Sequence, residues 1–228
     1  MHTERGFDRL VNFSDAVVAI AITLLILPLV DSAKDLATVD LGELIERDGA
    51  SLLVFVISFA VIGRFWLAHH RSFEQYIGYN TALLWVNLFW LLTIVFLPFP
   101  TELMAQGGNT SQATVLLYIG TMVLTSATAC LSQWIVIRHP ELQAPEVRGT
   151  LTMVPALIAL AMLTTSLIIS QIVPDLGLYS LFLLVLLGPV QVVQRRVKRR
   201  AAGTGTGTGA GAAGATATEP AGTPPPPA

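Results

Sequence analysis

The residues best suited to chemistry stand at the start of an apolar stretch, RLVNFSDAVVAIAITLLILPLV (9–30), which is long enough to cross a bilayer. Its first seven positions hold Arg9, Asn12, Ser14 and Asp15. Ionisable groups inside membrane helices are costly, so they usually face protein, find partners, or mark ion and proton pathways. Asp15 could therefore be a cation ligand, a proton relay or a member of a structural hydrogen-bond network.

Asp15 needs partners from other helices. Arg9 lies six residues earlier on a different helix face, so the two side chains cannot pair simply along the helix. Two later segments, WLAHHRSF (66–73) and NLFW (87–90), offer hydrogen-bond donors: Trp66, His69, His70, Arg71, Asn87 and Trp90. The sequence thus predicts a polar cluster at the inner end of the first three helices, and it favours a structural role for Asp15.

The two adjacent histidines, His69 and His70, could bind zinc or sense pH, because imidazole titrates near neutrality. Adjacent helical residues point to different faces, however, so structural hydrogen bonding is favoured and no metal site is expected. The single cysteine, Cys130, excludes a disulfide framework and a cysteine-based metal site.

The remainder of the first stretch presents a second face. At 100° per residue, a stripe runs through Ile20, Thr23, Leu24 and Leu27, and Asp31 continues it into the next loop. Asp15 points to nearly the opposite side. Such residues at helical spacing more often pack against helices or lipid than line a pore. A role for Asp31 at an outer mouth rests on helical phase alone.

The elements that position these residues follow from composition. Of 228 residues, 53% are hydrophobic and 12% are charged, about half the charge of a soluble domain. Six apolar runs are long enough to span a bilayer: Leu10–Val30, Leu52–Ala68, Ala82–Phe99, Val115–Ile137, Leu151–Val173 and Leu176–Val193. We therefore expect an all-α, multi-pass membrane protein, whose first run is too long and too acidic for a cleavable signal peptide.

The basic residues set the topology. Eleven of the thirteen Lys and Arg residues lie before the first run, at the end of the second (Arg64 and Arg71), between the fourth and fifth, or after the sixth. The exceptions are Lys34 and Arg47, in the acidic segment 31–48. The positive-inside rule then predicts six helices with both termini cytoplasmic. The acidic segment is either a solvated, partly helical loop or a field that concentrates cations.

The C-terminal part divides into two segments. RRVKRR (195–200) is expected to fix orientation and contact anionic lipid, with nucleic-acid binding only a remote alternative. Residues 201–228, almost entirely Gly, Ala, Thr and Pro, have nothing to bury and are expected to be disordered. The predicted domain organisation is therefore a membrane domain over 1–200 and a cytoplasmic tail over 201–228.

One combination of residues resembles a known family. Arg9, Phe13, Ser14 and Asp15, in the pattern R-x-x-x-F-S-D before AVVAIAITLLIL, resemble the first helix of the six-helix potassium channels related to the lysosomal potassium channel. The HH after Trp66 and the stretch NLFW…LPFPT (87–101) are similar to that family's second and third helices. The similarity is strong over residues 5–101 and mainly topological afterwards.

The resemblance implies a potassium-preferring cation channel of the plasma membrane, with no carbonyl filter and no cofactor beyond the permeant K⁺. A chain with one six-helix unit is implied to form a homotetramer around its first helix. Large aliphatic residues form the constriction in that family and a threonine layer contributes to selectivity, which here implies Ile20, Leu24 and Leu27 with Thr23. The motif network is implied to comprise Arg9, Phe13, Ser14, Asp15, Trp66, His69, His70, Asn87 and Trp90.

Two other function classes match the sequence less well. A secondary transporter or proton-coupled carrier would be expected to show discontinuous helices in two matching halves, and no repeat is visible between residues 1–110 and 111–200. An intramembrane enzyme is disfavoured, because the last three runs hold no acid, histidine or nucleophile–base pair. The chain is therefore not expected to be an enzyme.

Overall fold

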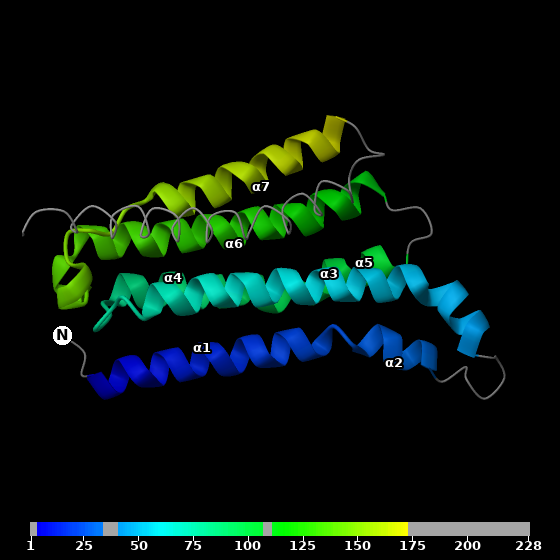
Figure 1. The fold of residues 1–228 in the computed structure, drawn as a ribbon, viewed down its shortest axis with the longest axis horizontal. Coiled ribbons are helices and arrows are strands. Elements are labelled where there is room, and N and C mark those ends of the chain that lie inside the picture. The colour runs from blue at the N-terminus through cyan, green and yellow to red at the C-terminus, as the bar shows by residue number, and fades with distance from the viewer. Residues whose placement is uncertain (1–3, 34–40, 107–110, 173–228) are drawn as a thin grey trace, which may run out of the picture. The chain divides into compact units, whose positions relative to one another are not determined.

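The computed structural model describes residues 4–33, 41–106 and 111–172. Seven α-helices occur in these ranges: α1 (Glu4–Leu24), α2 (Leu27–Ala33), α3 (Leu41–Phe73), α4 (Thr81–Phe96), α5 (Pro98–Gln106), α6 (Gln112–Arg138) and α7 (Val154–Ile172) (Figure 1). Two short 3₁₀ helices, η2 (Pro140–Leu142) and η3 (Pro145–Val147), lie between α6 and α7.

Five stretches are long and apolar enough to cross a membrane: Arg5–Asp31, Asp48–Phe73, Thr81–Ala105, Gln112–Arg138 and Val154–Ile172. They coincide with the first five predicted runs and confirm an all-helical, multi-pass architecture in this part of the chain. The sixth predicted run, 176–193, and the predicted tail, 201–228, lie outside the described residues.

Two of these stretches are interrupted, which the apolar runs alone did not predict. The first breaks at Leu25 and Ile26, between α1 and α2. Pro28 lies two residues after Ile26; it has no backbone N–H, and its ring would clash with the carbonyl of Leu24 in a continuous helix. Pro98 has the same effect at Leu97, between α4 and α5. Both breaks lie toward the predicted outer side of the membrane.

The apolar core lies among α1, α3, α4 and α6. Its deeply buried side chains include Ile62, Trp90, Ile94, Tyr118, Ile119 and Met122. The first helix contacts α3 and α4, while α6 packs against α4 and α7. Together these contacts hold one side of α1 against the rest of the bundle.

Hydroxyl groups connect the helices inside this core. Ser58 and Tyr118 join α3 to α6 over 3.0 Å, and Thr101 of α5 donates to Ser58 over 3.1 Å. Thr125 of α6 donates to Thr93 of α4 over 2.9 Å. Polar groups in an apolar interior need such partners, so these bonds fix the relative positions of the helices.

Two loops join at one end of the bundle. The N–H of Ile77, after α3, donates to the carbonyl of Leu142, after α6, over 2.9 Å, and the N–H of Ala144 donates back to Gln75 over 2.9 Å. Figure 1 shows both loops at the same end as the start of α1. The positions of the basic residues predicted that these two loops lie on the same side of the membrane.

Tyr76 connects the loop after α3 to α6, because its buried hydroxyl donates to Oε1 of Gln133 on α6 over 3.0 Å. We expect Tyr76→Phe to lower the free energy of unfolding by about 1 kcal/mol at neutral pH, since Gln133 loses its donor. The midpoint of thermal unfolding in detergent should fall by about 2–4 °C. A midpoint equal to that of the parent protein would contradict this role.

The same residue has a pH signature. Burial raises the pKa of Tyr76 above its ordinary value of 10. A phenol whose pKa is raised by folding contributes stability that is complete below pH 10 and is lost as the pH rises toward the folded value. We therefore expect stability to fall less between pH 9 and pH 11 in Tyr76→Phe than in the parent, as measured by thermal unfolding across that range.

Candidate functional site: the first helix and its polar anchor

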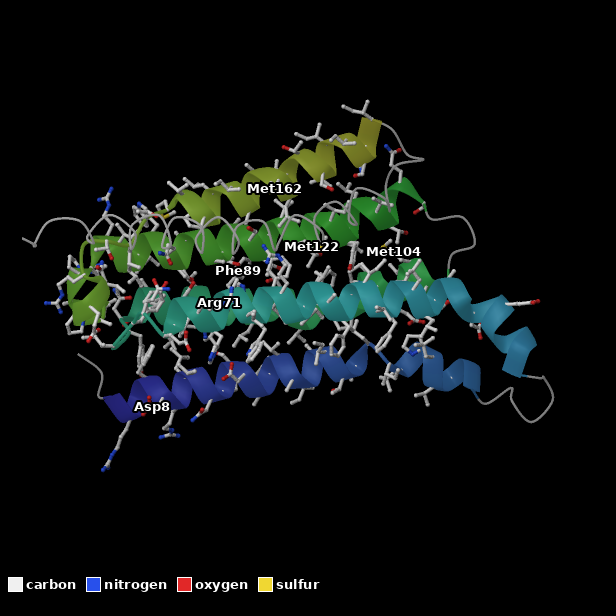
Figure 2. The ribbon with its side chains drawn as sticks, in the orientation of Figure 1. Asp8, Arg71, Phe89, Met104, Met122 and Met162 are labelled. Atoms are coloured by element: carbon white, nitrogen blue, oxygen red, sulfur yellow. The ribbon has the colours of Figure 1, made fainter. Side chains whose placement is uncertain are left out.

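The first helix has one buried and one exposed face. The buried face repeats every three or four residues through Phe7, Leu10, Ser14, Val18, Ala21 and Leu25. In Figure 2, side chains of α1 extend both toward α3 and away from the other described helices. The buried repeat follows the helical period and packs on α3 and α4.

The exposed face carries the predicted aliphatic stripe. The exposed fractions are 61% for Ile20, 40% for Leu24 and 53% for Leu27, within a single chain. Thr23 is exposed among them, and Asp31 is exposed beyond α1. The break before α2 does not remove Leu27 from this face. The chain therefore presents a continuous apolar ridge with one hydroxyl in it.

The hydroxyl of Thr23 has a defined direction. Its Oγ1 donates to the carbonyl of Ile20 over 2.8 Å. The hydroxyl proton is thus held by the same helix, and the oxygen lone pairs remain available to a group outside the helix. Such an oxygen can accept a hydrogen bond or contact a cation, but it cannot readily donate.

Asp15 is anchored from α3. The indole Nε1 of Trp66 donates to Oδ1 of Asp15 over 2.8 Å, and Asp15 is half-buried. A hydrogen bond to an ionised carboxylate is stronger than one between neutral groups. Asp15 therefore faces α3, and among the candidate donors it is Trp66 that binds it.

A second chain of hydrogen bonds joins α1, α4 and α3. Ser14 Oγ donates to the carbonyl of Leu10 over 2.8 Å, so it must accept from Nδ2 of Asn87, 2.9 Å away. The carbonyl oxygen of Asn87 then points to Nε2 of His69, at 2.7 Å. Since that oxygen only accepts, His69 carries a proton on Nε2. Ser14 and Asn87 are each about 1% exposed.

Aromatic rings enclose His69. Its imidazole stacks on Trp90, with ring centroids 4.0 Å apart, and on Phe73, at 4.1 Å. This environment fixes the ring plane, so Nε2 is directed toward Asn87. Trp90, which is 1% exposed, therefore contributes to the network by packing.

His70 points elsewhere, as expected for adjacent residues on a helix. It stacks on Trp66 at 5.2 Å, and its Nε2 lies 3.4 Å from a carboxylate oxygen of Glu74. Glu74 was not singled out from the sequence, although its i,i+4 spacing from His70 is the signal that could have found it. Among the described residues, no three His, Cys, Asp or Glu side chains are grouped for a metal ion.

Arg9 and Phe13 are not brought into this network within one chain. Both side chains are exposed on α1, and Phe13 is 52% exposed. Both residues lie toward the side of α1 that carries Ile20.

The bond between Trp66 and Asp15 predicts a measurable loss. We expect Trp66→Phe to keep the ring stacking but to leave Asp15 without its indole donor, which lowers the free energy of unfolding by about 2 kcal/mol. The matched control is Trp85→Phe, because Trp85 is 66% exposed. Thermal unfolding in detergent tests this, and equal midpoints for the two variants would show that the bond is unimportant.

Comparison with known proteins decides the family. The family model described as endosomal/lysosomal potassium channel TMEM175 matches residues 9–98. A potassium channel of Streptomyces collinus is 31% identical over 150 residues, which cover 62% of this chain and 72% of that protein. The chain belongs to the TMEM175 family. The resemblance seen in the motif and in the first three apolar runs is thereby confirmed at the level of the family.

Two further comparisons support the TMEM175 assignment. A potassium channel of Chamaesiphon minutus is 40% identical over 99 residues, covering 43% of this chain and 49% of the relative. The crystal structure of a lysosomal potassium-selective channel TMEM175 homolog from the same organism matches with a TM-score of 0.67 and 26% identity, over 82% of this chain and 98% of that one. The family and these relatives are ion channels, which are not enzymes. The prediction that the chain is not an enzyme is therefore confirmed.

Proposed function

We propose that this chain forms a potassium-preferring cation channel of the plasma membrane, with both termini cytoplasmic. Four copies would assemble so that α1 of each faces a central pore. The observation that carries this proposal is the exposed ridge of Ile20, Leu24 and Leu27 on a helix whose opposite face is fixed to its own subunit. The relatives named as potassium channels support it.

The ridge has the properties of a hydrophobic gate. Rings of four aliphatic side chains make a narrow bore that holds no stable water, so an ion cannot enter with its hydration shell. When the helices separate, water enters. Four Thr23 oxygens, whose protons are held by the Ile20 carbonyls, would then face a partly dehydrated K⁺. Asp31, exposed beyond the ridge, would add negative charge at the outer mouth.

The polar anchor has a separate role in this mechanism. The bonds of Ser14 and Asp15 to Asn87 and Trp66 hold the inner part of α1 against its own subunit. The ridge is then presented to the other copies in a fixed orientation. Arg9 and Phe13, exposed on the same helix, would contact a neighbouring subunit. Lipid would surround the remaining exposed apolar surface.

One observation favours a different function class. The breaks at Leu25–Ile26 and at Leu97 make two membrane stretches discontinuous, as in many secondary transporters. These breaks fall in the first and third stretches, however, and not at matching positions of two repeated halves. A secondary transporter or proton-coupled carrier is therefore the alternative to exclude.

A bilayer measurement separates the two functions. The purified protein is reconstituted into planar bilayers with a K⁺ gradient, and Na⁺ is then substituted on one side. A channel gives unitary current steps, and its reversal potential follows the K⁺ gradient. Slow, saturable exchange without unitary steps would identify a carrier and overturn the proposal. Cross-linking in native membranes, with a four-copy product expected, tests the assembly independently.

A further inference from the structure

A charged side chain lies inside the second membrane stretch, outside the polar anchor. Arg64 belongs to the stretch Asp48–Phe73 and is exposed on α3. It lies four residues, about 6 Å along the helix, inside the end of the apolar run Leu52–Ala68. Trp66, which binds Asp15, follows two residues later and so points to nearly the opposite side of α3. Arg64 therefore faces away from α1 and takes no part in the anchor.

Arg64 forms no ion pair and no side-chain hydrogen bond with any residue that the structure describes. The charged group that acts on it is Arg71, which has the same sign. Seven residues separate the two, so both lie on one face of α3, about 10 Å apart along the helix. Arg71 is also exposed, and Figure 2 shows it toward the end of the bundle where α1 begins. An unpaired cation inside a membrane is costly, so this pair calls for an anionic partner.

The rest of this face is apolar. Leu53, Ala60 and Leu67 lie on it and are exposed, so aliphatic side chains continue from the two arginines along the helix. In the proposed assembly α1 meets the other copies, whereas this face of α3 points away from α1. A molecule with an anionic head and a long apolar tail therefore matches the face better than a carboxylate of another copy does.

We propose that Arg64 and Arg71 bind the phosphate of an anionic phospholipid of the phosphatidylglycerol class, in the membrane leaflet at the end of α3. A guanidinium binds phosphate through paired, charge-assisted hydrogen bonds. Arginine side chains near helix ends also extend toward the interface, where the phosphates lie. A zwitterionic lipid would bring an ammonium group beside two cations. The bound lipid would hold α3 from the side opposite to the polar anchor, with its acyl chains along Leu53, Ala60 and Leu67.

Native mass spectrometry tests the site without any current measurement, so its outcome is independent of the proposed channel function. Delipidated full-length protein in detergent is titrated with dioleoyl phosphatidylglycerol or dioleoyl phosphatidylcholine. We expect one tight phosphatidylglycerol site per chain, with about tenfold higher affinity than for phosphatidylcholine. Arg64→Gln should weaken phosphatidylglycerol binding about tenfold and leave phosphatidylcholine binding unchanged. Arg5→Gln is the matched control, because Arg5 is exposed at the start of α1 and the variant should bind as the parent does.

Further measurements keep the test decisive if Arg64→Gln does not fold. Arg71→Gln is expected to weaken phosphatidylglycerol binding about fivefold. Arg64→Lys keeps the charge but loses the paired donors, so it should weaken binding about threefold. Free glycerol 3-phosphate should not displace the lipid, because it has no acyl chains.

Four results would overturn the proposal. They are equal affinities for the two lipids, arginine variants that bind phosphatidylglycerol as the parent does, displacement by glycerol 3-phosphate, and an equal loss in Arg5→Gln. If Arg64→Gln binds lipid as the parent does but gives less multi-copy product on cross-linking, the partner of Arg64 is an acidic group of another copy and not a lipid.

Discussion

Replacing Ile20 by Asn is expected to raise the single-channel conductance several-fold and to loosen the preference for K⁺ over Na⁺. Ile20 is the most exposed member of the ridge, at 61%, and it lies one turn before Leu24. An amide in each of four copies would hold water in the constriction, and a wetted constriction has a lower barrier to ion entry. Leu27→Ala shortens the side chain and so widens the constriction without adding polarity. It is expected to change the conductance in the same direction.

The measurement is unitary current in planar bilayers, with reversal potentials under mixed K⁺ and Na⁺. The matched control is Ile168→Asn on α7, since Ile168 has a similar exposed fraction of 54%. That variant places the same amide on a different membrane helix and should conduct as the parent does. Unchanged currents in both Ile20→Asn and Leu27→Ala would contradict the proposal that these residues form the gate. An equal increase in current in Ile168→Asn would show that the effect is not specific to the first helix.

Asn87→Leu is expected to lower the free energy of unfolding by about 2 kcal/mol, because the buried Nε2–H of His69 loses its acceptor. For a chain of this length the midpoint of thermal unfolding should fall by about 4–8 °C. Ser14 should contribute little to the loss, since its proton is already donated to the carbonyl of Leu10. The assay is thermal unfolding of the purified protein in detergent.

A double substitution separates the hydrogen bond from the change in packing. In Asn87→Leu/His69→Phe both partners are apolar, so no buried donor is left unpaired and part of the stability should return. Asn12→Leu is the control, because Asn12 is exposed on α1. The loss in the free energy of unfolding is compared between the double variant and the single variants Asn87→Leu and His69→Phe. If the loss in the double variant exceeds the sum of the two single losses, the proposed direction of the Ser14–Asn87–His69 chain is wrong.

Several features of the fold could be predicted from local sequence. Each apolar run is long enough to cross a bilayer, and the described structure has helices at the first five of them. The positions of basic residues predicted that the loops after α3 and α6 lie on one side, where the structure joins them. The helical period separated Asp15 from Ile20 and Leu24, and the structure places Asp15 toward α3 and the two aliphatic residues outward.

Other features depend on how the helices pack. Six donors were candidates for Asp15, and helical phase alone could not choose Trp66 among them. The pairs Ser58–Tyr118 and Thr93–Thr125 were not anticipated, because each joins residues 60 or 32 positions apart. The breaks before Pro28 and Pro98 had a local signal in proline chemistry, but their position within a continuous membrane stretch had not been inferred.

The sequence by itself determined that the chain is a helical membrane protein of the TMEM175 family with a two-faced first helix. These properties depend on residue type and spacing along one helix, which local chemistry controls. Only the tertiary structure decided which side chains anchor that helix, where it bends, and that Arg64 and Arg71 are exposed on the side of α3 away from the anchor. The physical reason is that such contacts form between helices, whose rotation and spacing are set by the packing of the whole bundle.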